Sequence, residues 1–497
     1  MAQKLDTLAD AEAAAKDALS RGDIAGAVPA FRALTRLAPD RWQVWLNLGM
    51  GFTANPLSFE QHKGEAIVAL KRCLLLHPSC GKGWRWVGSG KGDADEEELC
   101  FIRSSTCPDA PYDSLAVSAA VYQQRGDAPG AVERYRRALA MKEVEETRIN
   151  LASALIELGE IDEVREVLGS YPMSDPRAEE FLGWCKLAER DRAGYALYQK
   201  RWADGGGCAR MGTFKSPLWM GESGYDGTLA LWGEFGVGDE VCFANFIPEA
   251  LRRAKGKVRL ECNGRLQPLF QRSFPEVEVV AHVEDAAPSD GPHCPTTRLP
   301  CLFDTPLDEA YEPARALVPD LDRVRYWKEV YSTMGPGPYT GVNWRGGTAH
   351  TGPRKSVPLE LMAPLFGALS GTLISLQRIG EQEGAEIHAA ELAGRPVPLL
   401  NPDEEIGKDL DDLAAQIAAL DQVICISSTN AHMAGAVRTP GLILMQENPL
   451  WFWFKDGESV PWYPSLRLFR QHNQDWREAI ERAIASLDQG RIPRNSE

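Results

Sequence analysis

The feature of this sequence that most restricts its possible folds is an internal repeat in the N-terminal half. A small position, a large position and a terminating position recur 39 residues further on, within the range of about 34 to 47 residues typical of helix-pair repeats, and again later in the chain. Because one helix pair cannot bury its apolar face alone, this repeat predicts a stack of helix pairs instead of one globular core. The three copies are Ala27, Phe31 and Pro39; Ala66, Leu70 and Pro78; and Ala131, Tyr135 and Ala138.

The spacing is that of tetratricopeptide repeats, in which each unit is a pair of antiparallel helices. Small residues such as Ala27 and Gly49 are expected to let the two helices approach closely. Phe31 and Trp45 are expected to fill the groove between neighbouring pairs. The sequence therefore predicts a tetratricopeptide-like α-solenoid over residues 1–204.

Three turns between the expected helices carry a glycine. Gly22 and Gly126 lie in two copies of Arg-Gly-Asp, and Gly159 lies in Leu-Gly-Glu. Each is expected to end a helix in the left-handed conformation, which glycine adopts without steric penalty. The pattern breaks at 54–63 and 89–112, which indicates one insertion and one degenerate repeat.

A stack of helix pairs has a concave groove that typically holds a peptide or a partner protein. We therefore expect the repeats to bind a polypeptide, the alternative being a passive scaffold.

Charge and composition exclude several classes of protein. Lys and Arg number 54 against 70 Asp and Glu, so the net charge of −16 repels nucleic acid and anionic lipid. The sequence has no apolar run long enough for a membrane helix and no signal-peptide pattern at its start, which predicts a cytoplasmic protein. Its 11 cysteines include no Cys-x-x-Cys pair, so we expect reduced, buried thiols.

The C-terminal half alternates short β-rich runs with helical ones, a pattern typical of parallel α/β sheets. The change follows three glycines at 205–207, and a second set of strands begins after 335. We therefore expect two Rossmann-like lobes, 205–334 and 335–497, facing across a cleft. Strands are expected at 228–232, 257–262, 276–282, 339–344, 371–377, 397–400, 422–427 and 441–446.

Ligands of such sheets lie beyond the carboxyl ends of the strands, so the loops there are the first places to seek a site. The loop after the first strand contains Gly233, Gly236 and Gly238, followed by Asp239 at the start of a helix. The glycines permit close approach of a ligand, and the carboxylate could accept a proton from an attacking hydroxyl. A tight turn with Asp239 as a helix cap is the structural alternative.

The loop after the strand at 422–427 is rich in small polar residues at a helix start. Ser427, Ser428, Thr429 and Asn430 come where a helix exposes free N–H groups, which indicates an anion site for phosphate. His432 lies one turn further on. A lone histidine is more often structural, but here it shares the helix start with these polar residues.

The loop after the strand at 339–344 concentrates positive charge in an acidic chain. Arg345, Arg354 and Lys355 are expected to bind an anionic leaving group, unless the loop is simply a solvated surface. No Asp-x-Asp pair stands in a loop where it could hold a metal at such a site, so neither a metal nor a cofactor is expected.

Six aromatic residues gather near the C-terminus. They could stack on a base or a sugar, although packing within or between lobes is the commoner use of such residues. An amphipathic helix from Asp475 to Leu487 is expected to pack back on the sheets. The aromatic residues are Trp451, Phe452, Trp453, Phe454, Trp462 and Tyr463.

Several short segments of the sequence, taken together, resemble those of bacterial proteins that join tetratricopeptide repeats to a glycosyltransferase-B domain similar to the heptosyltransferases. These proteins include repeat-containing flagellin glycosyltransferases. The likeness covers nearly all of the chain. The matching segments are GYALYQKRW, PLWMGE, LWGEFGVGDEVCFANF, HCPTTRLP, GVNWRGG, VPLELMAPL, SLQ, IAALDQVICIS, AHMAGA and WYPSLRLFRQ.

The resemblance implies an inverting, metal-independent transfer of a sugar from a nucleotide-activated donor. It implies that Asp239 is the general base, that Lys355 or Arg354 is the basic residue of the donor site, and that His432 is the helix-start histidine. Relatives usually have Asp-Thr five and four residues before that histidine, where this chain has Ser427 and Ser428.

The leading hypothesis is a glycosyltransferase that modifies Ser or Thr of a polypeptide, such as flagellin, held by the repeats. One alternative is a non-catalytic adaptor with a degenerate transferase half. The other is a lipopolysaccharide sugar transferase, which the acidic balance disfavours because it would need a lipid-facing basic surface.

Overall fold

The computed structural model of this chain forms two compact units, Met1–Leu158 and Gly159–Glu497. The first is helical, and the second combines helices with two parallel sheets. The described residues are 5–23, 26–53, 56–89, 94–170, 172–202, 211, 214–282, 291–308, 316–347, 352–403, 406–473 and 475–488.

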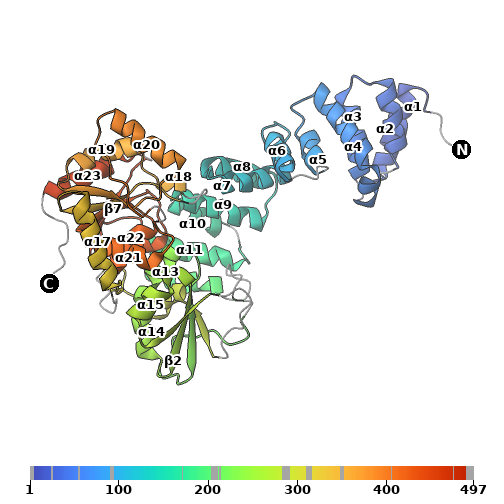
Figure 1. Cartoon of the computed structure of the whole chain (residues 1–497). Helices are drawn as coiled ribbons and strands as arrows, with labels where there is room; N and C mark the ends of the chain where they lie inside the picture. Colours follow the sequence, from blue (N-terminus) through green and yellow to red (C-terminus); the bar gives the residue numbers. More distant parts are fainter. Residues whose placement is uncertain are drawn as a thin grey trace. The chain divides into compact units, whose positions relative to one another are not determined.

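Consecutive helices pair along the first unit (Figure 1). They are α1 (Leu8–Ser20), α2 (Val28–Leu37), α3 (Trp42–Thr53), α4 (Pro56–Leu76), α5 (Gly81–Ser89), α6 (Ala94–Ser105), α7 (Tyr112–Gln124), α8 (Ala128–Met141) and α9 (Glu145–Leu158).

Small residues set the distance between paired helices, as the sequence predicts. A Cβ on Gly49 of α3 would lie 2.5 Å from Cγ of Leu70 in α4, so only glycine allows this approach. The repeat is also visible in its hydrogen bonds. The indole N–H of Trp45 donates to the carbonyl oxygen of Pro39, and that of Trp84 donates to Pro78, both at 2.8 Å.

The predicted turn glycines adopt the expected conformation. Their φ angles are 72° at Gly22, 83° at Gly126 and 75° at Gly159, all in the left-handed region. Each glycine follows the end of a helix, where a residue with a Cβ would be strained.

The second unit begins with helices and continues into a four-stranded lobe. The helical elements are α10 (Ile161–Gly169), α11 (Pro176–Ala188), α12 (Gly194–Tyr198) and η1 (Gln199–Trp202). The lobe that follows comprises β1 (Thr228–Trp232), α13 (Val237–Phe243), η3 (Ala244–Phe246), α14 (Ile247–Arg253), β2 (Lys257–Cys262), η4 (Gly264–Leu266), α15 (Gln267–Ser273), β3 (Val277–Ala281), β4 (His293–Pro295), η5 (Thr296–Arg298) and α16 (Leu299–Leu302).

The first sheet is parallel throughout, with strand order β3-β2-β1-β4. Leu229 of β1 pairs with Val258 of β2, and Leu260 of β2 pairs with Val279 of β3. All four side chains are buried, which fits a sheet between helices.

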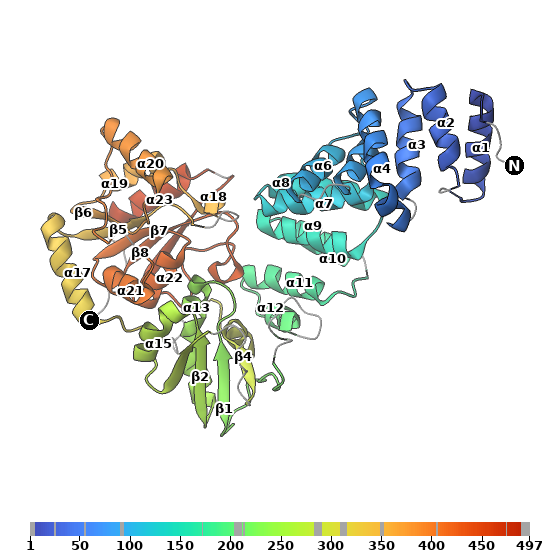
Figure 2. The ribbon, with the colours of Figure 1, turned by 45° about the vertical axis from the view of Figure 1, so that its right-hand side comes forward.

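The second lobe holds a five-stranded parallel sheet of order β6-β5-β7-β8-β9. Figure 2 shows α19, α20 and α23 on one face of this sheet and α17, α21 and α22 on the other. The elements are α17 (Leu321–Met334), β5 (Tyr339–Asn343), α18 (Gly352–Lys355), α19 (Leu359–Gly367), β6 (Thr372–Ser375), α20 (Glu381–Leu392), α21 (Leu410–Ala418), β7 (Gln422–Ile426), α22 (Thr429–Ala436), β8 (Gly441–Met445), η6 (Trp451–Trp453), β9 (Leu466–Arg470) and α23 (Arg477–Asp488).

The predicted fold class is confirmed: tetratricopeptide-like helices precede two Rossmann-like lobes in a layout like that of the glycosyltransferase-B fold. Two strands, β4 and β9, were not expected. The run at 397–400 contributes only an isolated bridge, between Leu399 and Ile374.

The compact units divide at residue 158, before the boundary at 204 expected for the end of the repeats. The glycines at 205–207 that suggested this boundary lie outside the described residues. The reason for the earlier division is that α11 contacts η6 of the second lobe, so the last helices pack with the sheets. Likewise α17, placed in the first lobe from the sequence, packs on α21 of the second.

In the described part of the chain, no helix is both long enough and apolar enough to cross a bilayer. The ten cysteines described there are free and buried, as expected from their spacing.

Candidate functional site

Two helices that follow strands of different lobes meet at one point of the second unit. Helix α13 follows β1, α22 follows β7, and the two helices are in contact. A Cβ on Gly238 of α13 would lie 3.1 Å from Cδ2 of His432 and 3.5 Å from Oγ1 of Thr429. The structure thus brings the Asp239 loop and the polar helix start, which the sequence marked separately, next to each other.

Asp239 is the third residue of α13 and is partly buried. Its Oδ2 accepts a hydrogen bond from the N–H of Gly236 at 3.2 Å, so the side chain does cap the helix. Burial raises the pKa of Asp239 to about 6, against the opposing effects of this hydrogen bond and the charge of Lys355. A carboxylate with this pKa is ionised at neutral pH and is a stronger base than an ordinary aspartate.

Lys355, at the end of α18, supplies a positive charge near Asp239. Burial lowers the pKa of Lys355, and the carboxylate of Asp239 partly offsets this effect. Burial lowers the pKa of His432 to about 3, and the positive charge of Lys355 contributes to this shift. Lys355 therefore lies within electrostatic reach of both predicted site residues.

His432 is neutral at physiological pH and lies among aromatic rings. Its Nδ1 is 3.1 Å from the hydroxyl of Tyr463, and its ring centroid is 4.7 Å from that of Trp453. Burial holds the pKa of Tyr463 well above its usual range, so the hydroxyl keeps its proton. His432 is thus a positioned neutral imidazole and not a source of charge.

The start of α22 presents backbone N–H groups, because its cap side chain is engaged elsewhere. Ser428 forms no side-chain cap, and its hydroxyl donates to Oδ1 of Asn343 at 2.8 Å. The side-chain amide of Asn430 donates to the carbonyl oxygen of Leu376 at 3.1 Å. The first N–H groups of a helix lack intrahelical acceptors and favour an anion.

The hydroxyl of Ser427 donates to Oε1 of Gln446, so it also points away from the helix start. Of the four small polar residues in this loop, Thr429 is the one whose hydroxyl lies near Gly238.

The two predicted arginines differ in their surroundings. Arg345 forms an ion pair with Glu386 of α20, and its Nε lies 3.4 Å from Oε1 of Glu383. Two carboxylates therefore neutralise this guanidinium. Arg354 is partly buried on α18, and its charge contributes to lowering the pKa of Lys355.

None of the three predicted loop glycines has a positive φ; in this loop only Phe235 does, at 51°. Gly233 and Gly238 take part in close contacts instead. A Cβ on Gly233 would lie 2.6 Å from Cδ of Glu240, whereas one on Gly236 would approach only Oδ2 of Asp239, at 3.5 Å.

Sequence reasoning missed a buried ion cluster behind this loop. Arg201 of η1 pairs with Glu180 of α11 and, at 2.7 Å, with Glu234 of the loop. Trp202 and Thr297 also donate to the carboxylate of Glu234. Only the proximity of Glu234 to Asp239 in the sequence could have drawn attention to it, since its partners are distant in the chain.

The aromatic cluster is core, as the commoner explanation predicted. Trp451 contacts Phe243 of α13 and Tyr198 of α12, at centroid distances of 6.2 and 5.8 Å. Phe246 of the first lobe contacts Trp462, at 6.0 Å. The cluster therefore joins the last helices and both lobes within the second unit.

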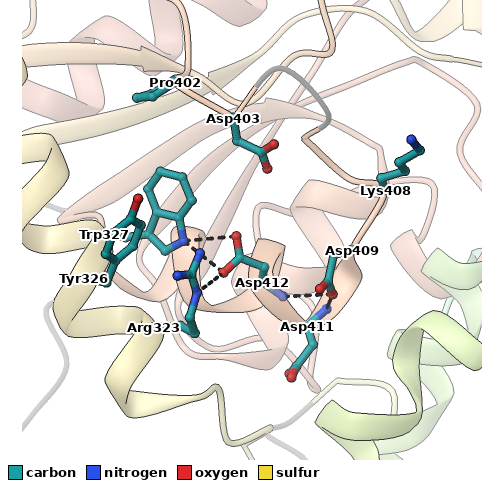
Figure 3. A pocket seen from close by; sticks show the side chains of 9 residues that line it. All are labelled: Arg323, Tyr326, Trp327, Pro402, Asp403, Lys408, Asp409, Asp411 and Asp412. Carbon is teal, nitrogen blue, oxygen red and sulfur yellow. Dashed lines mark hydrogen bonds and ion pairs between the residues drawn. The ribbon is translucent and has the colours of Figure 1, made fainter.

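A separate pocket of about 670 Å³ lies between α17 and α21 (Figure 3). Its acidic side chains have partners inside the protein. Asp412 accepts hydrogen bonds from Arg323 and Trp327, Asp409 caps α21, and Asp411 pairs with Arg272. The residues lining this pocket include none of those predicted for the site.

No cluster of three or more histidine, cysteine or carboxylate side chains that could hold a metal occurs in the part of the chain described. The expectation of a metal-independent reaction stays a prediction.

Comparison with known proteins gives one family match and one long sequence match. Residues 122–183 match the tetratricopeptide-repeat family. Over 461 residues the chain is 31% identical to protein FlbA of Caulobacter vibrioides, a match that covers 86% of this chain and 70% of FlbA.

Two solved structures are more distant. A family 9 glycosyl transferase from Veillonella parvula is 14% identical, with a TM-score of 0.39 over 54% of this chain and 98% of that one. Pseudomonas aeruginosa PilF is 16% identical, with a TM-score of 0.28 over 39% of this chain and 92% of that one. At such scores neither structure indicates what this chain does.

Proposed function

The chain belongs to the family of protein FlbA, and we propose that it is a glycosyltransferase. It moves a sugar from a nucleotide-sugar donor to a Ser or Thr hydroxyl of a polypeptide. One observation carries the proposal: Asp239, whose pKa is about 6, lies near Lys355 and near the start of α22, both of which belong to the other lobe.

In this reaction Asp239 accepts the proton of the acceptor hydroxyl while the hydroxyl oxygen bonds to the anomeric carbon. The bond from that carbon to the phosphate oxygen breaks on the opposite face, so the configuration inverts and the nucleotide leaves with the electron pair. Lys355 and the N–H groups of α22 stabilise the leaving phosphate without a metal. A positioned base of this kind contributes about 10²- to 10⁴-fold in rate.

The tetratricopeptide repeats support a polypeptide acceptor, because stacked helix pairs commonly bind peptides. Flagellin is the first acceptor to test, on the family resemblance. Similarity to FlbA does not identify a substrate. The nucleotide-sugar donor and the polypeptide acceptor are therefore both proposed.

The donor site is tested by thermal denaturation of the full chain with CMP, UDP, ADP or GDP. The matching nucleotide at 100 times its Kd should stabilise the fold by about 2.7 kcal/mol. Lys355→Met should weaken this effect, whereas Leu392→Ala, a change at an exposed residue, should not. Absence of stabilisation by any nucleotide would contradict the donor site.

The transfer is tested in cells of the organism from which this chain comes, carrying either the wild-type chain or the Asp239→Asn variant. The intact masses of the proteins of the two strains are compared. Loss of a sugar mass from one protein in the variant, with nucleotide binding retained, is the expected result. Full modification by Asp239→Asn would rule out its role as base.

One observation favours a second function, a non-catalytic adaptor. Ser427 and Ser428, which replace the Asp-Thr of relatives, turn their hydroxyls toward Gln446 and Asn343 and not toward the helix start. An adaptor would bind its polypeptide equally well with Asp239→Asn and would modify nothing in wild-type form, which the same mass comparison detects.

A further inference from the structure

Phe235 combines two properties that do not favour folding. Its φ of 51° lies in the left-handed region, which is strained for a bulky residue, and its side chain is 56% exposed. Burial of the ring therefore does not account for the strain. A strained residue beside a candidate site is a reason to look for a function there.

The residues on either side of Phe235 hold its backbone in place. Glu234 is fixed by Arg201, by the indole N–H of Trp202 at 3.2 Å and by the hydroxyl of Thr297. On the other side, the N–H of Gly236 donates to Asp239. These contacts fix the backbone on both sides of the exposed ring, and Asp239 follows four positions later in the sequence.

The ring of Phe235 also lies close to η1, the helical turn that follows α12. The guanidinium carbon of Arg201, in η1 directly after α12, is 4.9 Å from the centroid of the Phe235 ring. A polypeptide that places a hydroxyl at Asp239 would bring its neighbouring residues to this loop, because Phe235 directly precedes Gly236, whose N–H donates to Asp239. An aromatic ring at this position offers an apolar surface to the residues next to the modified hydroxyl.

We propose that Phe235 is an acceptor-binding residue, which selects polypeptide sites that have an apolar side chain within about two residues of the modified Ser or Thr. This inference rests on the proposed function and adds the chemistry of the acceptor. Its physical basis is the burial of apolar surface between the ring and that side chain, which stabilises the complex without taking part in proton transfer.

The experiment uses full-length variants expressed in source cells that lack the wild-type chain. Phe235→Gly removes the ring and fits the left-handed backbone, so the melting temperature should stay level or rise by about 1–3 °C. Modification of the acceptor should nevertheless fall at least tenfold. Phe235→Tyr keeps the ring and should retain modification, and Leu392→Ala is the matched exposed control.

The kinetic readout uses a synthetic peptide that spans the modified site found by mass spectrometry. Phe235→Gly should raise its KM about tenfold and leave kcat within twofold. Replacing the apolar neighbour by Asn in the peptide should raise the wild-type KM similarly and add little in the variant.

Wild-type modification by Phe235→Gly, or a modified site with only polar neighbours, would overturn the role of Phe235. A failure of the proposed function would give a different result. In that case the Asp239→Asn variant and the wild type would not differ in their modification of the acceptor.

Discussion

At the scale of single residues, the environment of Asp239 decides what this site can do. Burial raises the pKa of the carboxyl, while the N–H of Gly236 and the charge of Lys355 lower it. The balance leaves a pKa of about 6. Asp239 is therefore an ionised base at neutral pH that loses this role in mild acid.

This balance predicts the pH dependence of transfer. With Asp239 as the base, kcat/KM should fall about tenfold per pH unit below pH 6 and level off above pH 7. Lys355→Met removes a charge that lowers the pKa of Asp239, so the acidic limb should move to higher pH. The measurement is a pH profile of initial rates for wild type and Lys355→Met.

The control for this profile is Arg345→Met. Glu383 and Glu386 neutralise Arg345, so its loss should leave the acidic limb where it is in wild type. A limb that does not move in Lys355→Met, or moves to lower pH, would contradict the assignment of Asp239.

Between elements, the contact of α13 with α22 is the feature on which the site depends. Gly238→Ala would place a methyl group 3.1 Å from the ring of the buried His432, which has little room to move. We expect a small loss of stability, about 1 kcal/mol, and a loss of activity of tenfold or more, because misplacing a base by a fraction of an ångström weakens catalysis strongly.

The matched control is Gly236→Ala in the same loop. Gly236 has a φ of −84°, which alanine adopts freely, and a Cβ there meets only Oδ2 of Asp239 at 3.5 Å. Activity should stay within a few-fold of wild type. Equal losses in both variants, measured by initial rates and thermal denaturation, would show that the spacing of the two helices does not matter.

Much at the element scale was predictable from sequence because local rules determine it. The turn glycines Gly22 and Gly126 and the close contact at Gly49 follow from backbone and steric limits that act over a few residues or one helix pair. Strand β9 was missed, because arginines at 467 and 470 do not resemble a buried strand. Arg470 is nevertheless buried, donating to the carbonyl oxygens of Trp453 and Gly457.

The candidate site was predictable only in its parts. The loops with Asp239 and Thr429 were identified, because residues after parallel strands gather at one edge of a sheet. Their contact through Gly238, the pairing of Arg345 with Glu386 and the Arg201 cluster depend on residues far apart in the chain. No local pattern specifies such pairs.

For the whole molecule, the division at residue 158 changes what counts as the transferase part. Helices α11, α12 and η1 fall within the region expected from sequence to be repeats, yet η1 supplies Arg201 to the loop of Asp239, and α12 supplies Tyr198 to the aromatic core. Arg190, between α11 and α12, donates to the carbonyl oxygen of Leu307, which follows the last strand of the first sheet, and to that of Ser459, which lies between β8 and β9 of the second. The segment from α11 to η1 therefore contacts both lobes.

The division predicts how fragments behave. A fragment of residues 159–497 should unfold in one cooperative transition and should keep the stabilisation by the donor nucleotide. It should lose modification of the polypeptide, because the helices α1–α9 that we propose to hold the acceptor are gone. Differential scanning calorimetry and the mass comparison measure these effects.

A fragment of residues 205–497 is the matched comparison, and it should be much less stable. Without Arg201 the buried carboxylate of Glu234 loses its cation, a change that costs about 3–5 kcal/mol. Trp451 also loses its contact with Tyr198. Together these losses should lower the melting temperature by roughly 10 °C or more relative to 159–497. Equal melting temperatures would mean that α11, α12 and η1 belong with the repeats alone, and that the loop carrying Asp239 is held without them.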